Sequence, residues 1–160
     1  MTLDFAGEFF QLGYVTRNLD QAIELYRERY GVANFYRFSA GDFVPEGTPG
    51  PFLEVVLGYK GPVMIEIIQP APGDEGIYLD ALREDGGVSL HHIGYLVSED
   101  RFAKSNADFR ERGFEIPVVS LDPDGVSLSY IDTRSDTGLF TEMVMVNESQ
   151  QRFFSQIPHN

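Results

Sequence analysis

The stretch QLGYVT at residues 11–16 recurs later in the chain as HIGYLV at residues 92–97, with Gly-Tyr at the same offset. Near the end of each half, a glutamate interrupts an apolar run, in MIEII (64–68) and again in FTEMV (140–144). A sequence that repeats itself in this way predicts two similar structural units, so the repeat determines the expected fold.

Each half contains one amphipathic segment with helical spacing and four short runs that are typical of strands. In the first half, Asn18 can cap the helix and Lys60–Gly61 can form a hairpin turn, and in the second half Ser98 can cap the helix. The expected strands are 9–15, 33–39, 51–59 and 63–69 in the first half and 90–97, 114–121, 126–132 and 138–146 in the second, with helices at 19–31 and 99–113.

The pattern therefore predicts an α+β domain over residues 1–160, made of two βαβββ modules. We expect the first module at 9–70, a linker at 71–89 that contains a short helix, the second module at 90–146, and a tail at 147–160 that could add another short helix. The stretch 41–51 is rich in turn residues.

Composition excludes several classes of function. The chain has 160 residues and a net charge of −13 without a basic stripe, which disfavours nucleic acids and anionic membranes as partners. It has no cysteine, which excludes disulfides and thiol chemistry. No secretion signal or membrane span is apparent, so we expect a cytoplasmic protein.

Four residues at equivalent positions of the two halves are candidate metal ligands. Gln11 and His92 lie on the first strand of each half, and Glu66 and Glu142 lie on the last. A buried carboxylate costs several kcal/mol unless it is paired or bound to a metal. An imidazole, two carboxylates and an amide oxygen suit a divalent ion. Alternatively, Gln11 is a satisfied polar residue of a strand, and the two glutamates lie at exposed strand edges.

The sequence resembles the vicinal-oxygen-chelate superfamily, which includes glyoxalase I, methylmalonyl-CoA epimerase, extradiol dioxygenases and bleomycin-resistance proteins. The resemblance covers roughly residues 9–146 and rests on four stretches: NLDQAIELYRERYGV, IEIIQP, HHIGYLV and GLFTEMV. It implies two βαβββ modules that pair into a half-open mixed-sheet barrel. The four ligand positions of the family fall on Gln11, Glu66, His92 and Glu142. Gln11 favours a glyoxalase, since the epimerases have His there, whereas the linker favours an epimerase.

The resemblance also implies a chemistry. One divalent ion (Zn, Ni, Co, Mn or Fe) would bind a carbonyl oxygen and the developing enolate, while Glu142 removes the adjacent proton. Glu54 is a second candidate for this acid–base role, or else a solvent-facing strand residue. His91 is expected to have a packing or supporting role. The implied partner is a small carbonyl compound or thioester, and the implied assembly is a homodimer.

The resemblance leaves two classes of function open. The first is an epimerase, isomerase or glyoxalase-like lyase, whose substrate could also be hydrophobic. The second is a small-molecule binding or resistance protein of the same fold without catalysis. An extradiol dioxygenase is disfavoured because its iron site needs two histidines, and His92 is the single histidine among the four positions.

Overall fold

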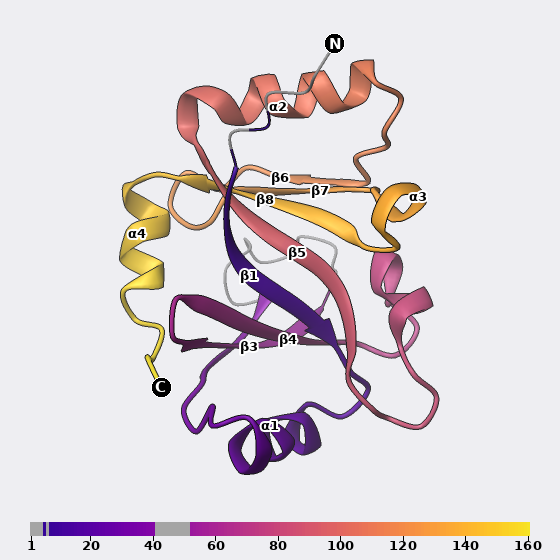
Figure 1. Cartoon of the computed structure of the whole chain (residues 1–160), viewed down its shortest axis with the longest axis vertical. Coiled ribbons are helices and arrows are strands. Elements are labelled where there is room, and N and C mark those ends of the chain that lie inside the picture. Colours follow the sequence, from indigo (N-terminus) through magenta and orange to yellow (C-terminus); the bar gives the residue numbers. More distant parts are fainter. Residues whose placement is uncertain (1–4, 6, 41–51) are drawn as a thin grey trace. The chain divides into compact units, whose positions relative to one another are not determined.

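A computed structural model describes residues 5, 7–40 and 52–160 of the chain (Figure 1). The turn-rich stretch 41–51 lies outside the described residues. The strands are β1 (Glu8–Val15), β2 (Tyr36–Ser39), β3 (Leu53–Lys60), β4 (Val63–Pro70), β5 (Ser89–Ser98), β6 (Val118–Ser120), β7 (Leu128–Ile131) and β8 (Phe140–Val146). The helices are α1 (Leu19–Arg29), the 3-10 helix η2 (Gly76–Ala81), α2 (Glu99–Glu111), α3 (Arg134–Thr137) and α4 (Glu148–Phe154).

The hydrogen-bonded strand order is β2-β3-β4-β1-β5-β8-β7-β6, which is a mixed sheet. The chain divides into two compact units, and β1 and β5 each contribute residues to both. We call residues 12–91 with 157–160 the first unit, and the residues up to Gln11 together with 92–156 the second unit. The α+β class and the βαβββ order of each half are confirmed.

In the first unit, α1 covers one face of the strands. The side chains of Leu19, Ala22 and Tyr26 from α1 pack against Val56 of β3 and the pair Ile65 and Ile67 of β4. Alternate residues of a strand point to opposite faces, so Glu66 and its neighbours Met64 and Ile68 project from the face away from α1. The helix begins as expected at Asn18, whose side chain accepts a hydrogen bond from Gln21 N.

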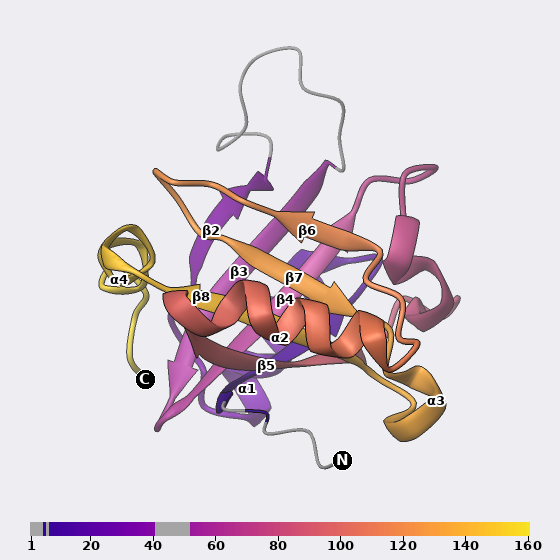
Figure 2. The same ribbon diagram turned by 90° about the horizontal axis from the view of Figure 1, so that it is seen from above.

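In the second unit, α2 has the equivalent position. Its residues Phe102 and Phe109 form a cluster with Val97 of β5, Ile131 of β7 and Met143 of β8. Figures 1 and 2 show α2 running across these strands. By strand alternation, His92 and Glu142 project from the opposite face. In each unit, therefore, the helix takes one face of the strands and the candidate ligands take the other.

Several details differ from the sequence-based expectations. Strand β6 has only three residues, α3 was not expected, and the hairpin turn falls at residues 61–62, one position later than predicted. Ser98 occupies the N-cap of α2, but its side chain makes no capping hydrogen bond. The expected short helices in the linker and the tail are present as η2 and α4. None of these differences moves a candidate ligand off its strand.

Candidate metal centre

His92 and Glu142 form a buried pair in the second unit. Strands β5 and β8 run parallel, and their register places Gly94 opposite Glu142 and His92 opposite Phe140. The side chains are 0% and 4% exposed, and His92 Nε2 lies 3.4 Å from Glu142 Oε2. Glu142 Oε2 accepts no hydrogen bond from the described part of the chain. A buried carboxylate oxygen beside an imidazole nitrogen is a favourable arrangement for a shared cation.

The side chain of Gln11 lies directly over Gly94, the residue of β5 that is paired with Glu142. A Cβ atom placed on Gly94 would lie 2.5 Å from Gln11 Oε1 and 2.8 Å from Gln11 Cβ. The Gln11 side chain therefore occupies the volume that any larger residue at position 94 would need. Gln11 is itself buried, with 3% of its surface exposed. Since Gly94 pairs with Glu142, the amide oxygen of Gln11 lies over the position on β5 that is adjacent to Glu142 on β8. The structure thus brings Gln11, His92 and Glu142 together.

Tyr130 is a neighbour that the sequence did not single out. It pairs with Glu142 in the β7–β8 register, it is buried, and its ring meets the His92 ring edge-on at 5.1 Å between centroids. The ring restricts the rotation of the imidazole and excludes water from one side of the pair. Only the register between β7 and β8 reveals this contact, and the spacing of the two strands in the sequence does not fix that register.

Glu66 lies in the first unit, in the middle of β4. It is buried at 9% exposure, and its partner across the hairpin is Leu57. The expectation of an exposed strand-edge glutamate is therefore not met. Glu66, like His92 and Glu142, is buried and offers one ligand atom.

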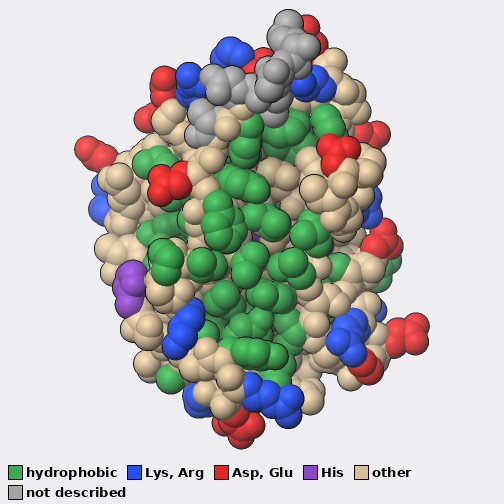
Figure 3. All heavy atoms as spheres, in the orientation of Figure 1, with side chains coloured by type: hydrophobic (Ala, Val, Ile, Leu, Met, Phe, Trp, Pro, Cys, Tyr) green, Lys and Arg blue, Asp and Glu red, His purple; other side chains and the backbone are tan. Residues whose placement is uncertain are grey.

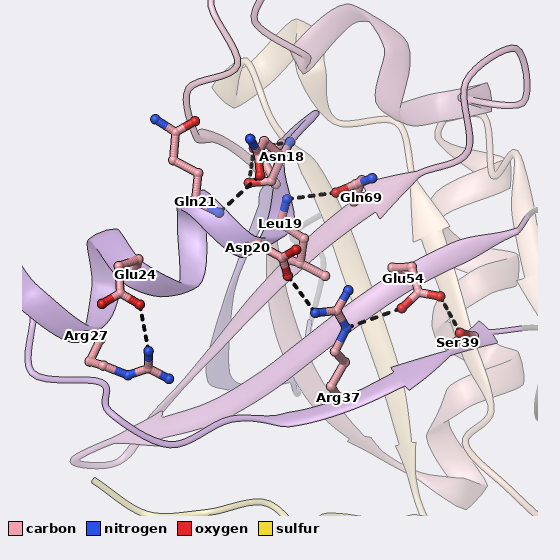
Figure 4. A network of polar contacts seen from close by, with 11 residues as sticks. Asn18, Leu19, Asp20, Gln21, Glu24, Arg27, Arg37, Ser39, Glu54 and Gln69 are labelled. Carbon is pink, nitrogen blue, oxygen red and sulfur yellow. Dashed lines mark hydrogen bonds and ion pairs between the residues drawn. The ribbon is translucent and has the colours of Figure 1, made fainter.

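Glu54 projects from the other face of the same hairpin. It pairs with Gln69 and Ser39, so it shares the α1 side of the sheet with Val56 and not the side of Glu66. Figure 4 shows its carboxylate between Ser39, which donates a hydrogen bond to it, and Arg37, whose Nε lies 3.4 Å away. Glu54 is 42% exposed in its side chain. This geometry favours the solvent-facing interpretation of Glu54 over the catalytic one.

The polar network around Glu54 attaches α1 to the strands. Arg37 also pairs with Asp20 of α1 at 2.7 Å, and this hydrogen bond is the main reason that the pKa of Arg37 is raised. Gln69 of β4 accepts a hydrogen bond of 2.7 Å from Leu19 N at the start of α1 (Figure 4).

The sequence contains a signal that assigns the face of Glu54. In a hairpin with a two-residue turn, one residue of each cross-strand pair has an odd number and the other an even number, and paired residues point to the same face. Residues 54 and 66 both have even numbers, so their side chains point to opposite faces of the hairpin.

His91 has the packing role expected of it. Its Nε2 lies 3.0 Å from the Ile77 carbonyl oxygen, and its ring packs on Tyr78 with 4.8 Å between centroids. Both partners belong to η2, so His91 holds the linker helix against β5. The two adjacent histidines therefore have different surroundings, because they point to opposite faces of one strand.

The residues of the second unit fit a divalent cation by their chemistry. The imidazole nitrogen, carboxylate oxygen and amide oxygen are buried, and a bound cation would compensate for the solvation that they lose. Mixed nitrogen and oxygen donors suit zinc and its first-row neighbours. Tyr130 and Phe140, whose rings lie 6.5 Å apart between centroids, form apolar walls beside the donors.

Comparison of the sequence with protein families matches residues 10–125 to the Glyoxalase/Bleomycin resistance protein/Dioxygenase superfamily. The chain belongs to this superfamily, which is the vicinal-oxygen-chelate group that its sequence resembles. No curated protein sequence matched the chain.

Solved structures with a similar fold include methylmalonyl-CoA epimerases. A variant of the Streptomyces coelicolor enzyme in complex with 2-nitronate-propionyl-CoA is 18% identical, with a TM-score of 0.64 over 89% of this chain and 96% of that one. The Mycobacterium tuberculosis enzyme is 15% identical, with a TM-score of 0.65 over 92% of this chain and 93% of that one. At such identities the likeness shows the fold alone.

No helix in the described part of the chain is both long and apolar enough to cross a membrane.

Proposed function

We propose that this chain is a divalent-metal-dependent enzyme that removes a proton next to a carbonyl group. The observation that carries the proposal is the buried pair of His92 and Glu142, with the Gln11 amide laid over Gly94 beside it. Glu66 completes the ligand set in this proposal, because it occupies the matching family position and is buried in an apolar strand. The metal, when bound, supplies a Lewis acid for a carbonyl oxygen.

In this proposal the side chains have separate tasks. Gln11, Glu66, His92 and Glu142 would hold the cation, and the ring of Tyr130 packs edge-on against the His92 ring. Glu142 is also the base: it leaves the metal, removes the proton and returns it, and its burial keeps water from competing for that proton. The product is an epimer, an isomer or a rearranged hydroxy acid. The similar epimerase structures favour an epimerase, and the Gln at position 11 favours a glyoxalase-type lyase.

Metal analysis tests the first half of the proposal. Purified protein should hold one divalent ion per chain, with loss of the ion in Gln11→Ala and Glu142→Gln. Two matched controls are Gln150→Ala, another buried glutamine of the second unit, and Glu54→Gln, a glutamate of the first unit. Both controls should keep the metal. Equal metal content in all four variants would contradict the ligand assignment.

Proton transfer is tested by exchange of deuterium from the solvent. Metal-loaded protein in D₂O should introduce deuterium next to the carbonyl of at least one member of a panel of 2-substituted acyl thioesters and hemithioacetals. Glu142→Gln should abolish this exchange, and Glu54→Gln should leave it unchanged. A protein that holds the metal and exchanges no proton in any panel member would instead be a binding protein of this fold.

A further inference from the structure

The second unit contains a surface pocket that none of the candidate metal ligands lines. Its volume is about 630 Å³, within the range of small-molecule sites. Residues 112–115, which follow α2, form one wall, and Asp132, Arg134 and Ser135 form the other where the chain enters α3. Figures 1 and 2 show these two segments side by side. The pocket is therefore a candidate binding site separate from the metal centre.

Hydrogen bonds hold the wall at α3 in a fixed geometry. Arg134 donates to the Asp132 carboxylate from Nε, from a terminal nitrogen and from its backbone N–H, at 2.9, 2.7 and 3.2 Å. The Arg134 guanidinium also lies 4.7 Å from the centroid of the Phe140 ring. Asp132 N donates to the Glu115 carbonyl oxygen at 2.9 Å, which connects the two walls. Such walls are formed before a ligand arrives, so binding needs little reorganisation of the chain.

The charges of Asp132 and Arg134 neutralise each other. The hydrogen bond from the Arg134 side chain is the main reason that the pKa of Asp132 is lowered, so Asp132 is ionised at neutral pH. A ligand that paired with either group would have to compete with the other. The charges that remain for a ligand are therefore those of the opposite wall.

The opposite wall carries one positive and one negative charge, from Arg112 and Glu115. Both residues are exposed, and neither forms an ion pair with another of the described residues. They do not pair with each other because α2 ends at Glu111 and Gly113 turns the chain between them, with a φ of 88°. On the face drawn in Figure 3, by contrast, several Lys and Arg side chains lie beside Asp or Glu.

An aromatic residue lies between these two charges in the sequence. Phe114 lines the same pocket, and its ring meets the ring of Phe109, a buried residue of α2, edge-on at 5.6 Å between centroids. Phe114 is only half-buried, so part of its surface remains accessible. The wall that follows α2 thus offers a cation, an anion and an apolar surface within four consecutive residues.

We infer that this pocket binds a small zwitterion with an apolar substituent, of the chemical class of an α-amino acid with an aromatic or branched side chain. The Arg112 guanidinium pairs with the carboxylate of the ligand, the Glu115 carboxylate pairs with its ammonium group, and Phe114 contacts its substituent. The lining carries two positive and two negative charges, which matches a ligand of zero net charge. A simple anion is disfavoured by the net charge of −13, and a simple cation leaves Arg112 unmatched.

Three probes of similar shape test this inference. L-Phenylalanine carries both charges, 3-phenylpropanoate carries only the carboxylate, and phenethylamine carries only the ammonium group. Titrations followed by ¹H–¹⁵N NMR give both the affinity and the location of binding. Phenylalanine should bind at least about threefold more tightly than either single-charge probe, since an exposed charge pair contributes on this scale. The amide shifts should be concentrated at residues 112–115 and 132–135.

Two substitutions assign the charges separately. Phenylalanine should bind Arg112→Gln no more tightly than phenethylamine does, and it should bind Glu115→Gln no more tightly than 3-phenylpropanoate does. Arg110→Gln is the matched control, because Arg110 is an exposed arginine of the same helix outside the pocket lining. This control should keep the wild-type order of affinities.

Three outcomes would overturn the inference. They are equal affinities of the wild-type protein for the three probes, the same loss in Arg110→Gln as in Arg112→Gln, and shifts at β5 and β8 in place of the pocket, which would locate phenylalanine at the candidate metal centre. None of these results bears on whether the chain is a metal enzyme, because no substitution changes a candidate ligand.

Discussion

Substitution of Gly94 by alanine should weaken metal binding although Gly94 itself offers no ligand atom. The added Cβ would lie 2.5 Å from Gln11 Oε1, 2.8 Å from Gln11 Cβ and 3.1 Å from Phe10 Cε1. Ordinary carbon contacts are about 3.5–4.0 Å, so these atoms must separate by roughly 1 Å. The amide oxygen can swing away, but Gln11 Cβ is fixed to the backbone of β1. Relief of the clash therefore moves the amide from its place beside Glu142.

Two magnitudes follow. Overpacking of this kind costs about 1–3 kcal/mol in the free energy of unfolding. Displacement of groups that position a metal ligand lowers metal affinity by about 10–100-fold. Competition with a chromogenic chelator gives the affinity, and urea unfolding in excess EDTA gives the stability without the metal contribution. Both should fall in Gly94→Ala.

Gly58→Ala is the matched control. Gly58 is also a crowded strand glycine, since a Cβ placed on it would lie 2.8 Å from the Asn34 carbonyl oxygen. None of the atoms that this Cβ would contact belongs to a proposed ligand. Gly58→Ala should lose stability and keep its metal affinity. A Gln11→Gly background should suppress the stability cost of Gly94→Ala, which a double-mutant cycle measures. Metal affinity within twofold of wild type in a folded Gly94→Ala protein would refute the reasoning.

Three further predictions concern stability. Gln69→Ala removes the acceptor of the 2.7 Å hydrogen bond from Leu19 N, and urea unfolding should show a loss of about 1 kcal/mol with metal affinity unchanged. The hydrogen bond from Arg134 lowers the pKa of Asp132, so this carboxylate stabilises the fold above its unfolded pKa of about 3.9 and loses that effect as the pH falls. The stability deficit of Arg134→Leu should therefore be present at pH 7 and shrink toward pH 2, and a deficit that stays constant over this range would count against the pair. A free metal concentration of 100 times the dissociation constant should raise the free energy of unfolding by about 2.7 kcal/mol relative to protein in EDTA. Melting experiments with metal and with EDTA should show no such rise for Glu142→Gln.

The sequence predicts most of this fold because its repeat and its strand periodicity are local signals. Gln11, Glu66, His92 and Glu142 all lie on the predicted strands, since each sits in an alternating or apolar run. The expected strand 114–121 is only Val118–Ser120, because a β-prone composition does not ensure a partner strand along its whole length. Helix α3 has four residues, which is too short for a helical period to appear.

The contacts that distinguish the candidate residues depend on register, which the sequence does not state. Gly94 and Glu142 lie on strands far apart in the chain, and Tyr130 and Glu142 lie on consecutive strands separated by α3, so neither pairing follows from a tight turn. The volume above Gly94 is likewise a tertiary property, since a strand glycine alone suggests only a close approach of some backbone or side chain. The sequence therefore predicts the candidate ligands but not the residues that would orient them.

The division of β1 between the two units affects how the protein is made. Gln11 belongs with residues 92–156, so the second unit cannot be completed from one continuous segment of chain. Joining Gln11 to His92 closes a loop of about 80 residues, at an entropic cost of about 4 kcal/mol before any contact compensates it. During synthesis, the amide of Gln11 leaves the ribosome early but reaches Glu142 only after β8 has emerged. The proposed metal site is therefore among the last parts of the molecule to form, and contacts of such long range favour slow folding.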